Sequence, residues 1–266
     1  MRRRPEQTAA VIALATAVVA AGMPVPPRAD EAPPDRRSGF DMMAPETRAM
    51  QADDTSNPGM LWVAEGARLW DEPAGEKNLA CAGCHGAAED SMRGVATRYP
   101  ALDRASQRPV DLAGRINLCR TGEQGAAALP REGDDLLALT AYVAHQSRGL
   151  PIAPPPDPEL EPFRAAGEAL YRRRLGQLAL SCAECHDRLA GARLGGNVVP
   201  EAHPTGYPIY RLEWQTLGSL QRRLRNCMIG VRAEPFAPGA PELGELELFL
   251  MKRAAGMPLE TPGVRP

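Results

Sequence analysis

The sequence predicts a mostly α-helical protein in which one helical plan occurs twice. Apolar residues recur at helical spacing, as in Leu136, Leu139, Tyr142 and Val143. Several positions of the first half also recur at a constant interval in the second half. The proline-rich run at 153–158 lies between the two halves and is typical of a stiff linker. We therefore expect an internal duplication into domains at 60–152 and 159–266.

The N-terminus has the pattern of a secretory signal. Arginines at 2–4 precede an uncharged apolar stretch, 9–21, that ends in small residues. This stretch falls short of the about 20 residues that a membrane span needs, although a retained anchor stays open. No apolar residues follow the arginines directly, which favours general secretion over a twin-arginine signal. We predict a signal peptide at 1–22, a periplasmic location and no membrane span after cleavage.

The segment that follows, 23–59, shows no helical or strand periodicity and is rich in Pro, Asp, Arg and Met. We expect it to be an extended N-terminal arm that packs on one of the domains. The chain as a whole carries a formal net charge of −2 at pH 7, which argues against nucleic acid as a partner.

The helices that open and close each half match between the halves. Gly66 and Trp70 precede Cys81 at the same spacings at which Gly167 and Tyr171 precede Cys182. Near the end of each half, five positions match at one constant interval: Leu139, Tyr142, Gly149, Pro151 and Ile152 match Leu246, Phe249, Gly256, Pro258 and Leu259. A small residue in each first helix would let it cross the closing helix closely.

Four of the six cysteines form two Cys-x-x-Cys-His motifs, which are c-type haem attachment motifs. Two thiols three positions apart reach the two vinyl groups of one haem, and the adjacent His can bind its iron. Zinc would need further ligands nearby, and a redox dithiol would not need the His in both halves. We predict two covalently bound haem c groups. Their residues are Cys81, Cys84 and His85 in the first half, and Cys182, Cys185 and His186 in the second.

The two remaining cysteines, Cys119 and Cys227, occupy matching places, each downstream of the motif of its own half. We predict that each is the distal ligand of its own haem iron, because thiolate is an established axial ligand that lowers the reduction potential. A disulfide between them stays open, as is usual for an even pair in an exported protein. Met228 is a competing ligand for the second haem, and His145 and His203 are weaker ones.

With these motifs, the helix pattern resembles the class I cytochrome c fold, so the expected fold is two class I cytochrome c-like domains from an internal duplication. The run from Arg222 to Pro235, Arg-Arg-Leu-Arg-Asn-Cys-Met-Ile-Gly-Val-Arg-Ala-Glu-Pro, resembles the active-site segment of the SoxA family. That family comprises the dihaem subunits of L-cysteine S-thiosulfotransferase. The resemblance covers residues 60–259, and its most specific piece is Cys-Met-x-x-x-Arg-Ala-Glu.

The resemblance implies an enzyme that oxidatively couples thiosulfate to a cysteine of a sulfur carrier. It implies that Cys227 is the catalytic sulfur, carried as a persulfide, and that Arg223 binds substrate; Arg232 is a second candidate for the substrate pocket. A guanidinium suits this role because it offers several donors in one plane to the sulfonate oxygens. Arg115 stands before Cys119 at the same spacing as Arg223 before Cys227, so spacing alone does not choose the reactive half.

The resemblance also implies two partners, the monohaem cytochrome SoxX as electron acceptor and the sulfur carrier SoxYZ. Two other functions stay open on the sequence. A dihaem electron carrier would need no reactive cysteine, and a dihaem peroxidase would need an open distal site, against which the two positioned cysteines argue. The arginines beside Cys227 have a plainer interpretation too, as a solvated basic face or as partners of haem propionates.

Overall fold

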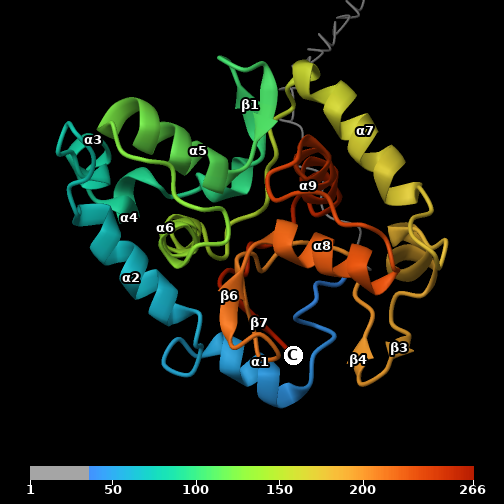
Figure 1. Ribbon diagram of the computed structural model, residues 1–266. Coiled ribbons are helices and arrows are strands. Elements are labelled where there is room, and N and C mark those ends of the chain that lie inside the picture. The colour runs from blue at the N-terminus through green and yellow to red at the C-terminus, as the bar shows by residue number, and fades with distance from the viewer. Residues whose placement is uncertain (1–35) are drawn as a thin grey trace, which may run out of the picture.

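The computed structural model describes residues 36–266, which form helices joined by short hairpins and loops (Figure 1). The predicted signal peptide at 1–22 and the first part of the predicted arm lie outside these residues. Within 36–266, no helix has both the length and the apolar character that a membrane crossing requires.

Two helix pairs organise the molecule. α2 (Met60–Asp71) packs against α6 (Asp134–His145) on one side of Figure 1, and α7 (Glu161–Arg172) packs against α9 (Pro241–Arg253) on the other. Each pair joins the opening and the closing helix of one half, as the sequence predicted. The Cys-x-x-Cys-His motif and the remaining cysteine of each half, Cys119 or Cys227, lie on the chain between these two helices.

A glycine at each crossing explains how closely the paired helices approach. A Cβ added to Gly66 would lie 2.2 Å from the carbonyl oxygen of Ala138, and one added to Gly167 would lie 2.0 Å from that of Glu245. Both distances are far below van der Waals contact, so any larger residue would push the helices apart. The two contacted carbonyls are separated by the same interval that relates the closing helices in the sequence.

Beside each crossing lies an aromatic side chain. Trp70 is buried in the first half and its ring centroid lies 6.0 Å from that of Tyr142. Tyr171 is buried in the second half, 5.2 Å from Phe249. The opening and closing helices thus meet through one aromatic from each, and this contact extends the apolar core beyond the glycine.

The remaining elements connect the helix pairs to the cysteines. In the first half they are α3 (Cys81–His85), α4 (Ala88–Ser91), η1 (Ala96–Arg98), the hairpin β1 (Ala101–Asp103) and β2 (Arg108–Val110), α5 (Leu112–Cys119) and η2 (Arg120–Gln124). In the second half they are η3 (Pro158–Leu160), η4 (Glu184–Arg188), the hairpin β3 (Arg193–Leu194) and β4 (Asn197–Val198), the strands β5 (Ile209–Arg211) and β6 (Thr216–Gly218), and α8 (Leu220–Gly230). The sequence analysis did not predict these hairpins.

The two halves share a core and a reciprocal backbone contact. The amide of Gly149 donates to the carbonyl of Leu259 at 2.8 Å, and the amide of Gly256 donates to the carbonyl of Ile152 at 2.8 Å. Buried side chains from both halves pack together here, among them Ala96, Ala144, Ile152, Met251, Ala254, Met257 and Leu259. The halves are therefore held in one fixed arrangement rather than by the linker alone.

The predicted extended arm is wrong for residues 45–52, which form helix α1 (Pro45–Ala52). This helix lies against the last strand, β7 (Gly263–Arg265), which itself pairs in parallel with β5. Its buried residues are polar: the side-chain oxygen of Gln51 accepts from the amide of Val264 at 2.9 Å. A helix that docks through a polar side chain shows no apolar periodicity, and so the pattern search missed it.

Candidate active site

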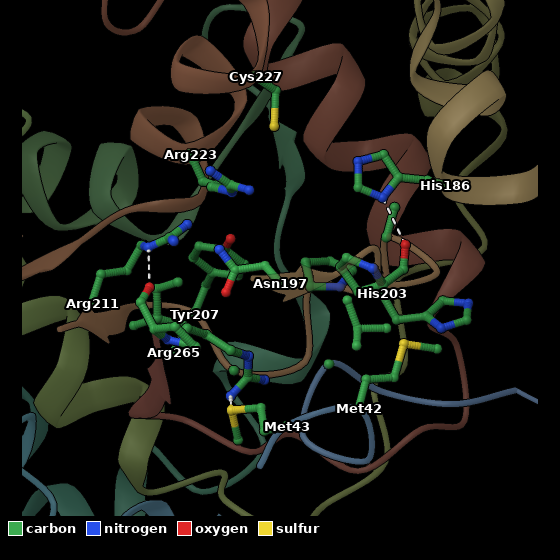
Figure 2. A pocket seen from close by; sticks show the side chains of 18 of the residues that line it. Met42, Met43, His186, Asn197, His203, Tyr207, Arg211, Arg223, Cys227 and Arg265 are labelled. Atoms are coloured by element: carbon green, nitrogen blue, oxygen red, sulfur yellow. Dashed lines mark hydrogen bonds between the residues drawn. The ribbon is translucent and has the colours of Figure 1, made fainter. Parts of the chain in front are cut away.

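The second attachment motif faces a cavity of about 390 Å³ that Cys227 also lines (Figure 2). Cys182 precedes η4, and Cys185 and His186 lie within it. The ring nitrogen Nδ1 of His186 lies 2.7 Å from the carbonyl oxygen of Pro200. This hydrogen bond fixes the ring and leaves Nε2 as the nitrogen that can interact with Cys227.

Helix α8 supplies Cys227 and Arg223 to the same cavity. Ser219 begins the helix, and its hydroxyl accepts from the amide of Arg222 at 3.1 Å, as an N-cap does. Arg223 and Cys227 are one helical turn apart and therefore lie on one face of the helix. Figure 2 shows both side chains directed into the space that His186 borders.

The surroundings of Cys227 favour its thiolate. Burial alone would raise the pKa of the thiol, but a hydrogen bond with His186 and the positive charges of Arg223 and Arg211 outweigh burial, so the pKa lies below its ordinary value. Tyr207 borders the same space, and burial raises the pKa of its hydroxyl to about 12. The phenol is therefore neutral near pH 7 and can donate a hydrogen bond.

Positive charge dominates the walls of this cavity. Its lining includes four arginines, and none of its lining residues within 36–266 is Asp or Glu. The arginines are Arg193, Arg211, Arg223 and Arg265. Arg265 is paired, with its Nη2 3.6 Å from Glu260. Arg223 forms no ion pair with any carboxylate of residues 36–266. The cavity is thus suited to an anion.

The first half brings its own predicted residues together. Cys119 ends α5, and it lies close enough to Cys81 and Cys84 for their charges to affect one another. Cys84 and His85 are exposed, and the His85 ring lies 5.7 Å from that of Trp70. Burial raises the pKa of the Cys119 thiol, in contrast to Cys227. Cys119 and Cys227 therefore lie in similar places but differ in the direction of their thiol pKa shifts.

Arg115 and Arg223 differ in the same way. The Nη2 of Arg115 lies 3.0 Å from the Oδ1 of Asp103, so its charge is already paired. Asp103 also accepts hydrogen bonds from the amide and hydroxyl of Ser106, which lower its pKa together with Arg115. Arg115 and Arg223 cannot be distinguished by their spacing in the sequence, but they differ in their ion pairing.

The residues around the cavity fit a covalently bound haem. Cys182 and Cys185 would provide the two thiols, and His186 would provide an imidazole whose Nδ1 is already engaged. Cys227 lines the same cavity as His186, so its sulfur and that imidazole could both hold one haem iron. Apolar walls, among them Leu224 and Leu250, complete a site for a flat apolar group.

Several other candidates from the sequence lie elsewhere. Arg232 is exposed and does not line the cavity. Met228 is buried and does not line it either. Cys119 and Cys227 are both free thiols, each beside its own motif, which does not support a disulfide between them. His145 lies half-buried on α6.

The structure places at the cavity one residue to which the sequence analysis gave little weight, and three that it did not single out. His203 lines it, with Nδ1 2.9 Å from the carbonyl oxygen of Arg37. Arg211, Asn197 and Tyr207 also line it, from strands or loops before α8 (Figure 2). No local motif marks these residues, because their relation to Cys227 depends on the folding of the hairpins.

Comparisons with known proteins agree with this geometry. The family profile described as SoxA/TsdA, cytochrome c domain, matches residues 65–152. The L-cysteine S-thiosulfotransferase subunit SoxA of Rhodovulum sulfidophilum is 36% identical over 86% of this chain and 80% of its own length. The subunit of the same name from Pseudaminobacter salicylatoxidans is also 36% identical, with the same coverage. The crystal structure of SoxXA from P. pantotrophus aligns with a TM-score of 0.83 at 29% identity, over 87% of each chain.

Proposed function

The chain belongs to the SoxA family of L-cysteine S-thiosulfotransferase subunits, and from this premise we propose how its residues divide the work. It is a cytochrome c subunit that takes part in thiosulfate oxidation and carries covalently bound haem c. Our proposal adds that there are two haems, that the two halves arose by internal duplication, and that the second half, 159–266, holds the reaction site. The assignment of the reaction site to the second half rests on Arg223, which lies beside Cys227 and forms no ion pair within residues 36–266.

The duplication rests on matching environments as well as on the sequence. Gly75 and Gly176 both have positive φ, and an added Cβ would meet a backbone oxygen at 2.2 Å in each case. The oxygens belong to Gln124 and Val231, which are related by the same interval as the closing helices. Matching contacts at matching intervals are expected if one domain was copied, and they support one haem site in each half.

We propose the following roles in the reaction. When bound, the haem supplies an acceptor for single electrons next to Cys227. Arg223 holds the sulfonate oxygens of thiosulfate, because a guanidinium and an anion form strong charge-assisted hydrogen bonds. Cys227, as a persulfide, keeps an outer sulfur available for exchange with the substrate. Asn197 and the neutral hydroxyl of Tyr207 add polar contacts at the same wall.

The overall change balances as follows. A carrier thiol and thiosulfate form one new sulfur–sulfur bond, the thiol loses its proton, and two electrons leave. The carrier is the proposed source of that thiol, a cysteine of SoxYZ. The two electrons pass to a partner cytochrome, proposed as SoxX, because the chain matches the SoxXA structure over most of its length. The predicted signal peptide at 1–22 supports a periplasmic location.

The decisive experiment measures the Cys227 peptide by mass under non-reducing conditions, alongside the intact mass of the mature protein. We expect two haems in the intact mass and an added sulfur on the Cys227 peptide. In low-spin ferric resonance spectra, Cys119→Ala and Cys227→Ala should each change one signal, as expected for His/thiolate ligation. A Cys227 peptide with no added sulfur at any stage, from protein working at full rate, would make Cys227 a ligand only.

A further inference from the structure

We propose that Arg211 is a second anion-positioning residue, and that it acts with Arg223 on the thiosulfate dianion. This inference rests on the proposed function and deepens it. It comes from a comparison of the segments that precede the distal cysteine in the two halves. These segments have the same backbone, but they place opposite charges at the same position.

The two segments match position by position at one constant interval, the interval that also separates Cys119 from Cys227. Each begins with a Tyr-Pro cis peptide, at Tyr99-Pro100 and Tyr207-Pro208. Each continues as an antiparallel pair of three-residue strands, β1 with β2 and β5 with β6. Positive φ falls at Gln107 and Gln215, with values of 55° and 52°. A capped helix follows in each half and carries the arginine and the cysteine one turn apart. The third strand residue is therefore structurally equivalent in both halves.

That residue is Asp103 in the first half and Arg211 in the second. Both are buried, at 7% and 6% exposure. Asp103 neutralises Arg115 through an ion pair of 3.0 Å. Arg211 instead faces Arg223, and after burial itself the positive charge of Arg223 is the main cause that lowers the pKa of Arg211. In the second half Arg223 thus meets a cation where Arg115 meets its carboxylate partner, and Arg211 has its own ion pair with Glu213.

Two cations close together in a buried place are unfavourable unless an anion joins them. The Arg211 guanidinium is held in place rather than free to swing away. Its Nε donates to the main-chain oxygen of Pro266 at 3.0 Å, its Nη2 forms an ion pair with Glu213 at 3.0 Å, and its Cζ lies 5.1 Å above the Trp214 ring. Glu213 is half exposed and lies outside the cavity, so it leaves the inner side of the guanidinium available.

Figure 2 shows Arg211 and Arg223 on the same wall of the cavity, below Cys227. A dianion between them would meet one guanidinium on each side, while its other end could approach the sulfur of Cys227. Thiosulfate has this shape and charge. Arg211 therefore contributes to binding and orientation, and the exchange chemistry belongs to Cys227.

The test uses the complete complex and compares Arg211→Lys, Arg211→Gln and Arg211→Asp. The last variant rebuilds in the second half the ion pair of the first. KM for thiosulfate should rise in that order, by on the order of tenfold for Gln and a hundredfold for Asp, as expected for lost charge-assisted contacts. The inhibition constant of sulfate, an unreactive dianion, should rise in parallel, and kcat should change much less.

Arg222→Gln is the matched control. Arg222 also stacks on Trp214, at 4.2 Å, but it does not line the cavity, so its loss removes the same charge nearby without touching the site. Its KM should stay within about twofold of the unchanged protein. Haem content and absorption spectra identify variants that are correctly assembled, and Arg211→Lys provides the measurement if a neutral variant fails to fold.

Two results would overturn the inference. One is that Arg211→Gln leaves both the KM for thiosulfate and the inhibition constant of sulfate unchanged. If the haem reduction potential shifts while both constants stay unchanged, Arg211 is a partner of the haem propionates instead. The other is an equal rise in KM for Arg222→Gln, which would indicate a general field effect. If the unchanged complex shows no thiosulfate-dependent reduction of its acceptor, the proposed function fails instead.

Discussion

The close crossing of α7 and α9 makes a sharp prediction about Gly167. A Cβ at this position would lie 2.0 Å from the carbonyl oxygen of Glu245 and 2.6 Å from its carbonyl carbon, whereas ordinary contact begins at 3.4 Å. Gly167→Ala must therefore move the helices apart by about 1 Å, since both contacted atoms belong to backbone. This movement also loosens the apolar contacts of Leu170 and Tyr171 with Leu246 and Phe249.

Overpacking of this kind costs about 3 kcal/mol in the free energy of unfolding, the upper end of the usual range, because no flexible side chain can give way. For a chain of this size the melting temperature should fall by roughly 6 to 12 °C. The assay is urea unfolding of the haem-loaded protein, followed by circular dichroism, with the haem absorption spectrum recorded in parallel. Gly66→Ala should lower the free energy of unfolding in the same way, because an added Cβ would lie 2.2 Å from the carbonyl oxygen of Ala138.

Gly244→Ala is the matched control, because Gly244 lies on α9 itself and an added Cβ would meet no atom within 4 Å. Alanine is the better helix former, so this variant should gain about 0.5 to 1 kcal/mol. The same Gly-to-Ala substitution should therefore lower the free energy of unfolding at position 167 and raise it at position 244. If Gly167→Ala were as stable as the unchanged protein while Gly244→Ala gained stability, the crossing would be looser than its geometry indicates.

Three further predictions concern charge and backbone. Arg223→Ala should raise KM for thiosulfate by on the order of tenfold or more; Arg115→Ala should leave KM unchanged and lower the free energy of unfolding by on the order of 1 kcal/mol, because it only removes the ion pair with Asp103. Arg232→Gly should leave turnover unchanged and raise stability by up to about 1 kcal/mol in urea unfolding, since Arg232 is exposed and holds a φ of 58°. Burial and the charge of Asp111 raise the pKa of Glu247, so above pH 4.5 the folded state retains a proton that the unfolded chain releases. The stability of the unchanged protein therefore falls as the pH rises. Glu247→Gln removes this carboxyl and should gain stability relative to the unchanged protein over the same range. Unfolding at mildly acidic and mildly alkaline pH checks the sign, and a constant difference between the two would contradict it.

The sequence predicted the parts of the fold that local patterns encode. The helix pairs and their glycines followed from residues at fixed distances from Cys81 and Cys182, and the structure confirms the paired helices. The hairpins before the distal cysteines were missed, because three-residue strands such as β1 and β5 are too short to show an alternating pattern. The docking of α1 on β7 was missed because it depends on contacts between segments far apart in the chain, such as Gln51 with Val264.

The candidate site likewise contains residues that local sequence patterns predicted and residues that they did not. Both motifs, Cys119, Cys227 and Arg223 were proposed from the sequence, since each lies at a fixed distance from another member of the set. Arg211 was not, because it lies on a separate strand well before Cys227, and only the hairpin and helix α8 bring it to the cavity. The difference between Arg115 and Arg223 also required the structure. It depends on whether a carboxylate, as in Asp103, or a guanidinium, as in Arg211, lies at the end of the preceding strand. The residues next to Arg115 and Arg223 in the sequence do not indicate which one is present.

Asp103 and Arg211 occupy the same strand position and need different partners. A buried carboxylate at position 103 is satisfied by Arg115 and Ser106, all within one hairpin and its following helix. A buried guanidinium at position 211 needs acceptors instead, and desolvation penalises it until they are present. One acceptor is the carbonyl of Pro266, which reaches Arg211 because β7 runs parallel to β5. The strand pairing that closes the second half therefore supplies one partner of the buried Arg211, and Glu213 supplies another, whereas the first half, whose hairpin has two strands, pairs Arg115 with Asp103.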